Sequence, residues 1–132
     1  MDYKGVIIEE SLADAGVLEM VQVLSTQVEA VTESHETPWL KQWTLHTVEI
    51  PEDRADAVAQ ALSDVLLSEP GTWYADFKNE QYHYIIYPNK VFRVRRESKE
   101  DYDRAEQYGQ SIRIPAHQLI NYEGEYKDRP TS

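Results

Sequence analysis

The most constraining feature of the sequence is a group of three short β-rich segments, 72–78, 81–87 and 91–96. Aromatic and β-branched residues, which fit the pleated surface of a sheet, are frequent in all three. The breaks between them contain Asn79-Glu80 and Pro88-Asn89, which are typical of tight turns. Turns of two residues connect neighbouring antiparallel strands. We therefore expect these segments to form a three-stranded antiparallel meander.

Two-residue turns would also fix which residues face each other across this meander, although a slip of one residue would exchange the partners. The expected cross-strand pairs are Phe77–Tyr82, Asp76–His83, Ile85–Phe92 and Tyr84–Arg93.

Side chains alternate between the two faces of a strand, so each face of the meander can be predicted. One face carries Tyr74, Asp76, His83, Ile85, Phe92 and Val94. The other carries Trp73, Ala75, Phe77, Tyr82, Tyr84, Ile86, Val91, Arg93 and Arg95. Both faces are largely apolar. If helices cover one of them, the other needs a second sheet, a second subunit or a ligand.

The remaining segments extend this sheet and add two helices. Residues 3–10, 21–31 and 43–50 are expected to be strands. Pro51 opens a helix that carries an apolar stripe on one side and ends at Glu69-Pro70-Gly71. Ser98 and Asp101 form a capping-box pattern that opens a second helix, residues 99–112.

This order of elements, β-β-β-α-β-β-β-α, predicts an α+β fold. We expect a twisted antiparallel sheet of about six strands, with the two helices packed on one face. Residues 1–122 are expected to form a single domain, in which 114–122 pairs or docks against the rest. Residues 123–132 are polar and are expected to be a flexible C-terminal tail.

Charge and composition exclude several classes of function. The chain has 132 residues, with 24 acidic and 13 basic side chains and a formal charge of −11. Phosphate backbones and anionic lipids would repel it, so we expect neither nucleic acid nor membrane as a partner. It contains no cysteine, which removes disulfides, thiolate nucleophiles and cysteine zinc sites. The N-terminus lacks the pattern of a signal peptide, and we expect a cytoplasmic protein.

The sharpest candidate for catalysis is the pair Asp76 and His83. A carboxylate beside an imidazole orients the ring and raises its basicity, as a general base requires. The alternative is an ordinary polar pair across two strands. No G-x-S-x-G nucleophile elbow and no glycine-rich phosphate loop accompanies the pair, so whether the protein is an enzyme stays open.

A second candidate is a set of aromatic and basic residues that would serve as a ligand site or an interface between subunits. Core packing is the alternative interpretation, because such residues dominate cores as well as interfaces. The set comprises Trp43, Trp73, Tyr82, Tyr84, Arg93 and Arg95.

The four histidines do not indicate a metal site. His35, His46, His83 and His117 show neither H-x-H nor H-x-x-x-H spacing. A metal would need ligands gathered from distant segments. We predict no metal site and no cofactor.

Two segments resemble a group of small uncharacterised bacterial and archaeal proteins. They are 37–46, TPWLKQWTLH, and 71–79, GTWYADFKN. The resemblance spans most of the chain, and it implies no activity.

Two functions are favoured over a third, nucleic-acid binding through Tyr82, Tyr84, Arg93 and Arg95, which the charge of −11 argues against. The first is a non-catalytic binding or protein-interaction module that self-associates as a homodimer through the aromatic sheet face. The second is a small enzyme that uses Asp76 and His83 for acid–base chemistry on a small molecule.

Overall fold

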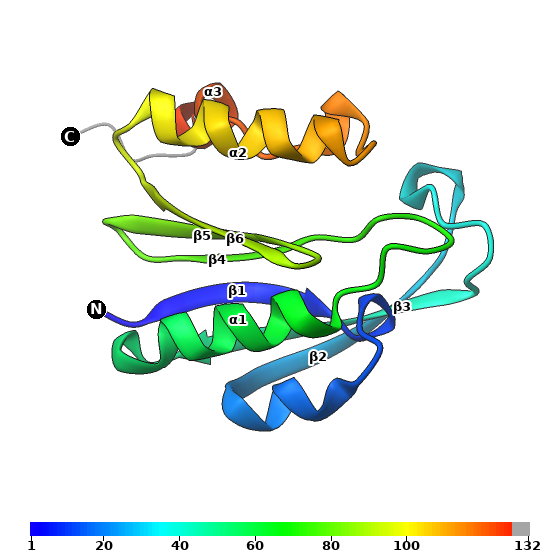
Figure 1. The fold of residues 1–132 in the computed structure, drawn as a ribbon. Coiled ribbons are helices and arrows are strands. Elements are labelled where there is room, and N and C mark those ends of the chain that lie inside the picture. The colour runs from blue at the N-terminus through cyan, green and yellow to red at the C-terminus, as the bar shows by residue number, and fades with distance from the viewer. Residues whose placement is uncertain (128–132) are drawn as a thin grey trace.

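One six-stranded antiparallel sheet forms the framework of the computed structural model, which describes residues 1–127 (Figure 1). The strand order is β2-β3-β1-β4-β5-β6. The strands are β1 (Tyr3–Ile8), β2 (Gln22–Ala30), β3 (Gln42–Ile50), β4 (Ala75–Lys78), β5 (Tyr82–Tyr87) and β6 (Lys90–Arg95). The helices are α1 (Ala55–Val65), α2 (Lys99–Ser111) and α3 (Tyr122–Lys127). The α+β class and the six-stranded antiparallel sheet are therefore confirmed.

The two halves of the sheet are joined through β1. This strand pairs antiparallel with both β3 and β4, with Gly5 opposite Val48 on one side and Phe77 on the other. Strands β3 and β4 therefore run parallel to each other, and α1 connects them. This arrangement is a split βαβ unit, in which β1 occupies the place between the two parallel strands.

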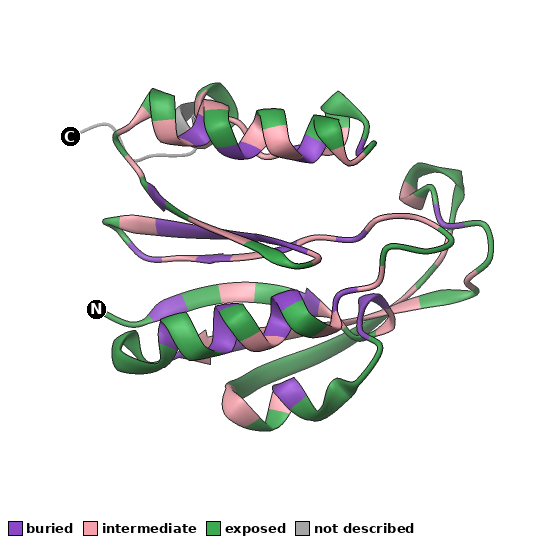
Figure 2. Ribbon diagram, in the orientation of Figure 1, coloured by how far each residue is buried: buried purple, intermediate pink, exposed green. Residues whose placement is uncertain are grey.

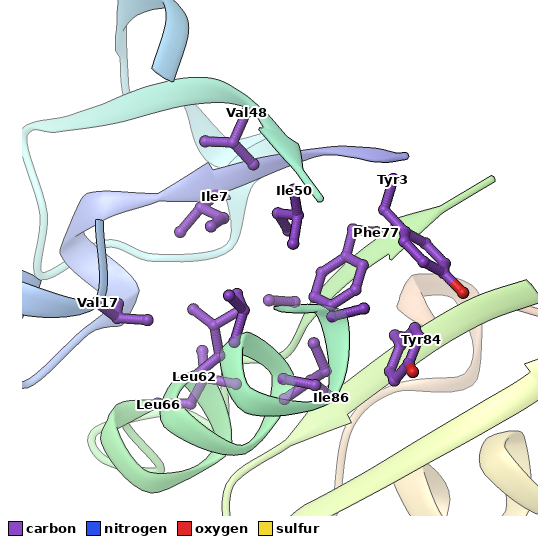
Figure 3. Packing of buried hydrophobic residues seen from close by; sticks show 14 of the residues in the cluster. Tyr3, Ile7, Val17, Val48, Ile50, Leu62, Leu66, Phe77, Tyr84 and Ile86 are labelled. Atoms are coloured by element: carbon purple, nitrogen blue, oxygen red, sulfur yellow. The ribbon is translucent and has the colours of Figure 1, made fainter. Parts of the chain in front are cut away.

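The long helices pack on opposite faces of the sheet, whereas the sequence analysis placed both on one face. Helix α1 packs against the face that carries Ile7, Val48 and Phe77 (Figure 3). Helix α2 packs against the other face, where Ile85 and Val94 are buried. The physical reason is that both faces of the meander are apolar, so each requires a cover, and the chain supplies one helix for each. In Figure 1 the meander of β4, β5 and β6 lies between α2 and α1.

Helix α2 begins and ends close to where its sequence signals predict, whereas α1 ends at Val65, before the predicted stop at Glu69-Pro70-Gly71. After Pro51 a short 3-10 turn, Glu52–Arg54, leads into α1. The apolar stripe of α1 is buried, and Val58 and Leu62 have no exposed surface. At α2 the Ser98 hydroxyl accepts a hydrogen bond from the Asp101 N–H at 3.1 Å.

The first hairpin of the meander has a different register from the one predicted. Asp76 pairs with Ile85, and Lys78 pairs with His83, because the turn residues are Glu80 and Gln81. The Asn79 side chain sets this turn, since its Oδ1 accepts hydrogen bonds from the N–H groups of Gln81 and Tyr82.

This correction shifts the first hairpin by two residues, which leaves every side chain on its predicted face. The second hairpin pairs as predicted, with Tyr84 opposite Arg93 and Ile85 opposite Phe92.

The C-terminal part of the described chain is ordered against the sheet. The segment after α2 docks through Ile114 and Leu119, both buried. Helix α3 is then formed by Tyr122–Lys127, so it includes the first residues of the expected flexible tail. The rest of that tail, residues 128–132, lies outside the described residues. Within residues 1–127, no helix combines the length and apolar character needed to cross a membrane.

Candidate functional site

An open cleft of about 730 Å³ lies on the face of the sheet that α2 covers only in part. Helix α2 packs over the β5–β6 side, so this face of β1 is left accessible, and Val6 is 43% exposed. Val6 and Ile8 from β1 contribute to the lining. Most of the remaining wall comes from the loop residues 34–39 and 113–118 and from 71–76, which includes the start of β4.

Tryptophan side chains form one wall of this cleft. Trp39 is 44% exposed and lies against Gly71. Trp43 packs edge-on between His35 and Trp73, with ring centroids 4.4 and 5.5 Å away. The Trp43 indole N–H donates a hydrogen bond to the Thr37 hydroxyl at 2.9 Å. This wall is therefore held in place by packing and by a hydrogen bond before any ligand arrives.

Asp76 brings a carboxylate to the cleft. Its side chain is 35% exposed, and its Oδ2 lies 2.6 Å from Nε2 of His83. His83 itself has no exposed surface. The other ring nitrogen, Nδ1, lies 3.1 Å from the Tyr102 hydroxyl and 3.3 Å from Oε1 of Glu125. Both ring nitrogens are thus engaged inside the protein, and only Asp76 of the predicted pair can reach a ligand.

Glu125 connects this network to two cations. Its Oε1 lies 2.8 Å from Nζ of Lys78 and 3.7 Å from Nη2 of Arg96. The Glu125 side chain is 14% exposed. Charges of both signs therefore meet under α3, and they hold this helix against β4 and β5 without opening into the cleft.

Tyr74 ties the segment after α2 to the sheet. Its hydroxyl donates a hydrogen bond to the carbonyl oxygen of Gln118. Burial, together with the negative charges of Asp76 and Glu125, raises the pKa of Tyr74 to about 12. Tyr74 therefore stays a neutral donor at physiological pH, and it fixes the wall formed by 113–118.

The opposite side of the cleft is closed by contacts between two loops. Glu36 accepts hydrogen bonds from His117, at 2.9 Å, and from the Gln118 side chain. The pKa of Glu36 is lowered mainly by the hydrogen bond from His117 and, to a smaller extent, by the hydrogen bond from Gln118. Arg113 also lines the cleft and is exposed. These contacts join 34–37 to 116–118, two segments about 80 residues apart in the sequence.

The predicted aromatic and basic set does not form one free surface. Trp73 and Tyr84 are 8% and 3% exposed and belong to the core under α1. The Arg93 guanidinium lies 3.8 Å above the Tyr82 ring. Arg95 forms an ion pair with Asp101. Of the six residues, Trp43 and Trp73 line the cleft. Of the aromatic residues in this set, Trp73 and Tyr84 are buried in the core under α1, whereas Trp43 and Tyr82 are half-buried.

Several cleft residues were not singled out from the sequence as a site, chief among them Glu36, Arg113 and His117. A signal was present, because the two segments on which the resemblance rests, 37–46 and 71–79, both border the cleft. The same two segments contain all three tryptophans of the chain. The third wall, 113–118, carries no comparable signal.

Within residues 1–127 no group of three or more histidine, aspartate or glutamate side chains is arranged to hold a metal ion. Comparison of the chain with family models, with curated proteins and with solved structures finds no match.

Proposed function

We propose that the protein is a non-catalytic binding module whose cleft takes a small molecule with a flat, apolar body. The observation that carries this proposal is the cleft of about 730 Å³ with Trp39 and Trp43 in its wall. Its volume lies within the usual range of ligand pockets, roughly 300–1,000 Å³. Aromatic walls with a few polar groups are typical of such pockets.

The alternative, an acid–base enzyme that uses Asp76 and His83, has less support. A general base must lie within hydrogen-bonding reach of the proton that it removes. His83 is fully buried, and both its ring nitrogens already contact oxygen atoms. Proton transfer in the cleft would therefore depend on Asp76 alone.

A library of planar aromatic fragments, screened by NMR on the ¹⁵N-labelled protein, tests the binding proposal. We expect binders to shift the indole N–H signals of Trp39 and Trp43. The variant Trp39→Ala should bind these fragments about fivefold more weakly, which corresponds to about 1 kcal/mol for one aromatic contact. Val28→Ala, at an exposed site on β2 outside the cleft lining, is the control. Fragments that leave the cleft signals unchanged, or that bind Trp39→Ala as tightly as wild type, would contradict the proposal.

Self-association is a second candidate function, and the exposed edge of β2 is the observation that favours it. Eight of its nine residues are exposed, including Val23, Leu24 and Val28. Figure 2 shows β2 largely in the green of exposed residues. Glu29 is its one charged residue. The opposite edge, β6, carries Lys90, Arg93 and Arg95, and such charges prevent edges from pairing.

We therefore place self-association at β2 instead of the aromatic face, which α1 covers. A bulge between Val23 and Ser25 interrupts the first part of the edge, so the regular part is 25–30. Two copies related by a two-fold axis would pair these segments antiparallel and close the assembly. In a chain with a charge of −11, this nearly uncharged edge is where two copies repel each other least.

Light scattering over a range of protein concentrations tests this second candidate. We expect a dimer in the wild type and a monomer in Val28→Lys, because lysine on an edge strand opposes pairing with another edge. Gln107→Lys, on an exposed position of α2, adds the same charge and should remain dimeric. A wild-type protein that is monomeric at all concentrations would contradict the candidate.

A further inference from the structure

The ionised groups of the cleft have an acidic balance. Two carboxylates, Asp76 and Glu36, line it together with one guanidinium, Arg113. Each carboxylate is bound to a histidine through one oxygen, Oδ2 of Asp76 and Oε2 of Glu36. Within residues 1–127, Oδ1 of Asp76 makes no hydrogen bond, so it can accept one from a ligand.

The position of Asp76 suits a ligand group that stays deep in the cleft. The carboxylate is 35% exposed, and its anchor His83 is completely buried. By contrast, Glu36 and its partner His117 are 44% and 66% exposed, and they lie at the rim. Asp76 is therefore a partly desolvated charge on a rigid strand, where an ion pair or charged hydrogen bond is strongest.

Aromatic rings next to a carboxylate favour positive charge. The face of an indole ring carries a negative quadrupole, and tryptophan is the best aromatic partner for a cation. Trp39 and Trp43 line the same cleft as Asp76. The raised pKa of Tyr74, caused by burial and by neighbouring carboxylates, is consistent with a negative potential at this end of the cleft.

From this arrangement, and resting on the proposed binding function, we infer that the ligand is a small organic cation. Its protonated amine or quaternary ammonium group binds Asp76, and its apolar body packs on Trp39 and Trp43. The charge of −11 on the whole chain would also attract cations to the cleft and repel anions. Arg113 is exposed, so water screens its charge more than that of Asp76.

Three probes of the same size and shape test this inference on the wild-type protein. They are 2-phenylethylamine, which is protonated at neutral pH, the neutral 2-phenylethanol, and the anion phenylacetate. Their dissociation constants are measured from the NMR shifts of the Trp39 and Trp43 indole signals and the Asp76 amide. We expect the amine to bind about tenfold more tightly than the alcohol, and the anion to bind most weakly.

A variant then assigns the preference to one residue. Asp76→Asn should remove the advantage of the amine and leave binding of the alcohol within about twofold, since the aromatic wall is unchanged. Asp64→Asn, the same change at an exposed position of α1 outside the cleft, should preserve the advantage. If Asp76→Asn does not fold, Glu36→Gln provides the comparison at the rim of the cleft. There we expect the affinity advantage of the amine over the alcohol to fall by a smaller factor.

The outcomes separate this inference from the proposed function. Equal affinities for the three probes at the cleft would overturn the preference for cations and leave the binding function standing. Tighter binding of phenylacetate than of the amine would also overturn the preference for cations and leave the binding function standing. If none of the probes shifts the cleft signals, the inference fails, and the fragment screen decides independently whether the cleft binds anything.

Discussion

Asp76 and His83 are hydrogen-bonded at 2.6 Å although they are not directly opposite each other in the sheet. Asp76 faces Ile85, and His83 faces Lys78, so the bond runs diagonally across the β4–β5 pair. Diagonal neighbours on one face lie within reach of long side chains. The consequence is an asymmetric pair, with a carboxylate at the cleft and a ring inside the core. His83 is thus a support for the cleft, and Asp76 is the group that a ligand meets.

This asymmetry predicts a large cost for replacing the buried member. In His83→Phe the ring still fills the space, but Asp76, Tyr102 and Glu125 lose a hydrogen-bonding or ion-pair partner. We expect a loss of about 2–4 kcal/mol in the free energy of unfolding, because the hydrogen bonds made by a fully buried imidazole ring are lost. Urea denaturation measures it. His117→Phe, at a histidine that is 66% exposed, should change stability by less than about 0.5 kcal/mol. Equal effects of the two variants would show that His83 has no such role.

The faces of the meander could be predicted because side-chain alternation is a local property. The predicted faces are unchanged although the predicted register of the first hairpin was wrong, because a shift of two residues returns each side chain to the same face. The error itself came from Asn79, whose side chain caps the turn. Nothing in a run of Lys78, Asn79 and Glu80 distinguishes a turn that begins at Asn79 from one that begins a residue later.

The face of the sheet that each helix covers, and the location of the cleft, could not be predicted from the sequence for a different reason. Two apolar faces indicate that two covers are needed, but they do not say whether the second is a helix, a subunit or a ligand. The cleft depends on contacts between distant loops, such as that between Glu36 and His117. Contacts of this kind are set by the tertiary fold, and hydrophobic periodicity carries no information about them.

Helix α3 should depend on a single acidic side chain. Glu125 contacts Lys78, Arg96 and His83, whereas Glu123 on the same helix is exposed. In Glu125→Gln we expect the amides of α3 to exchange at least tenfold faster, with a stability loss of about 1–2 kcal/mol, because Lys78 and the largely covered Arg96 lose their counter-charge. Hydrogen exchange followed by NMR provides the measurement. The control Glu123→Gln should leave exchange unchanged, and unaltered protection of α3 in Glu125→Gln would refute the prediction.

The packing of α2 requires glycine at position 109. A Cβ atom there would lie 2.4 Å from Cδ2 of Leu119 and 2.8 Å from the Tyr87 hydroxyl. The Tyr87 hydroxyl also donates to the carbonyl oxygen of Ala105, so it cannot move freely. Gly109→Ala should therefore destabilise the fold by about 1–2 kcal/mol, although alanine favours a helix by up to roughly 1 kcal/mol.

Thermal unfolding of this variant, compared with Gln110→Ala on the exposed neighbouring position, separates packing from helix propensity. The control should be neutral or slightly stabilising. A Gly109→Ala variant that unfolds at a higher temperature than wild type would mean that Leu119 can move aside.

The ion pair at the start of α2 predicts a defined dependence of stability on pH. Hydrogen bonding from the Arg95 side chain lowers the pKa of Asp101 from 3.8 to about 2. The folded-state pKa lies below the unfolded value, so folding favours the carboxylate. Its contribution is complete above about pH 4 and is lost as the pH falls toward about 2. Arg95 is 66% exposed, and screening by solvent reduces the expected contribution to about 1 kcal/mol.

Urea denaturation of wild type and of Asp101→Asn at a series of pH values measures this contribution as a difference. At neutral pH the variant should be less stable by about 1 kcal/mol, and the two curves should converge as the pH falls to about 2, because the protonated aspartate no longer pairs with Arg95. Other carboxylates titrate equally in both proteins and cancel in the difference. A gap that stays constant over the whole acid range would show that Asp101 acts through the hydrogen bond from the backbone N–H of Arg95, at 3.1 Å, without a contribution from its charge.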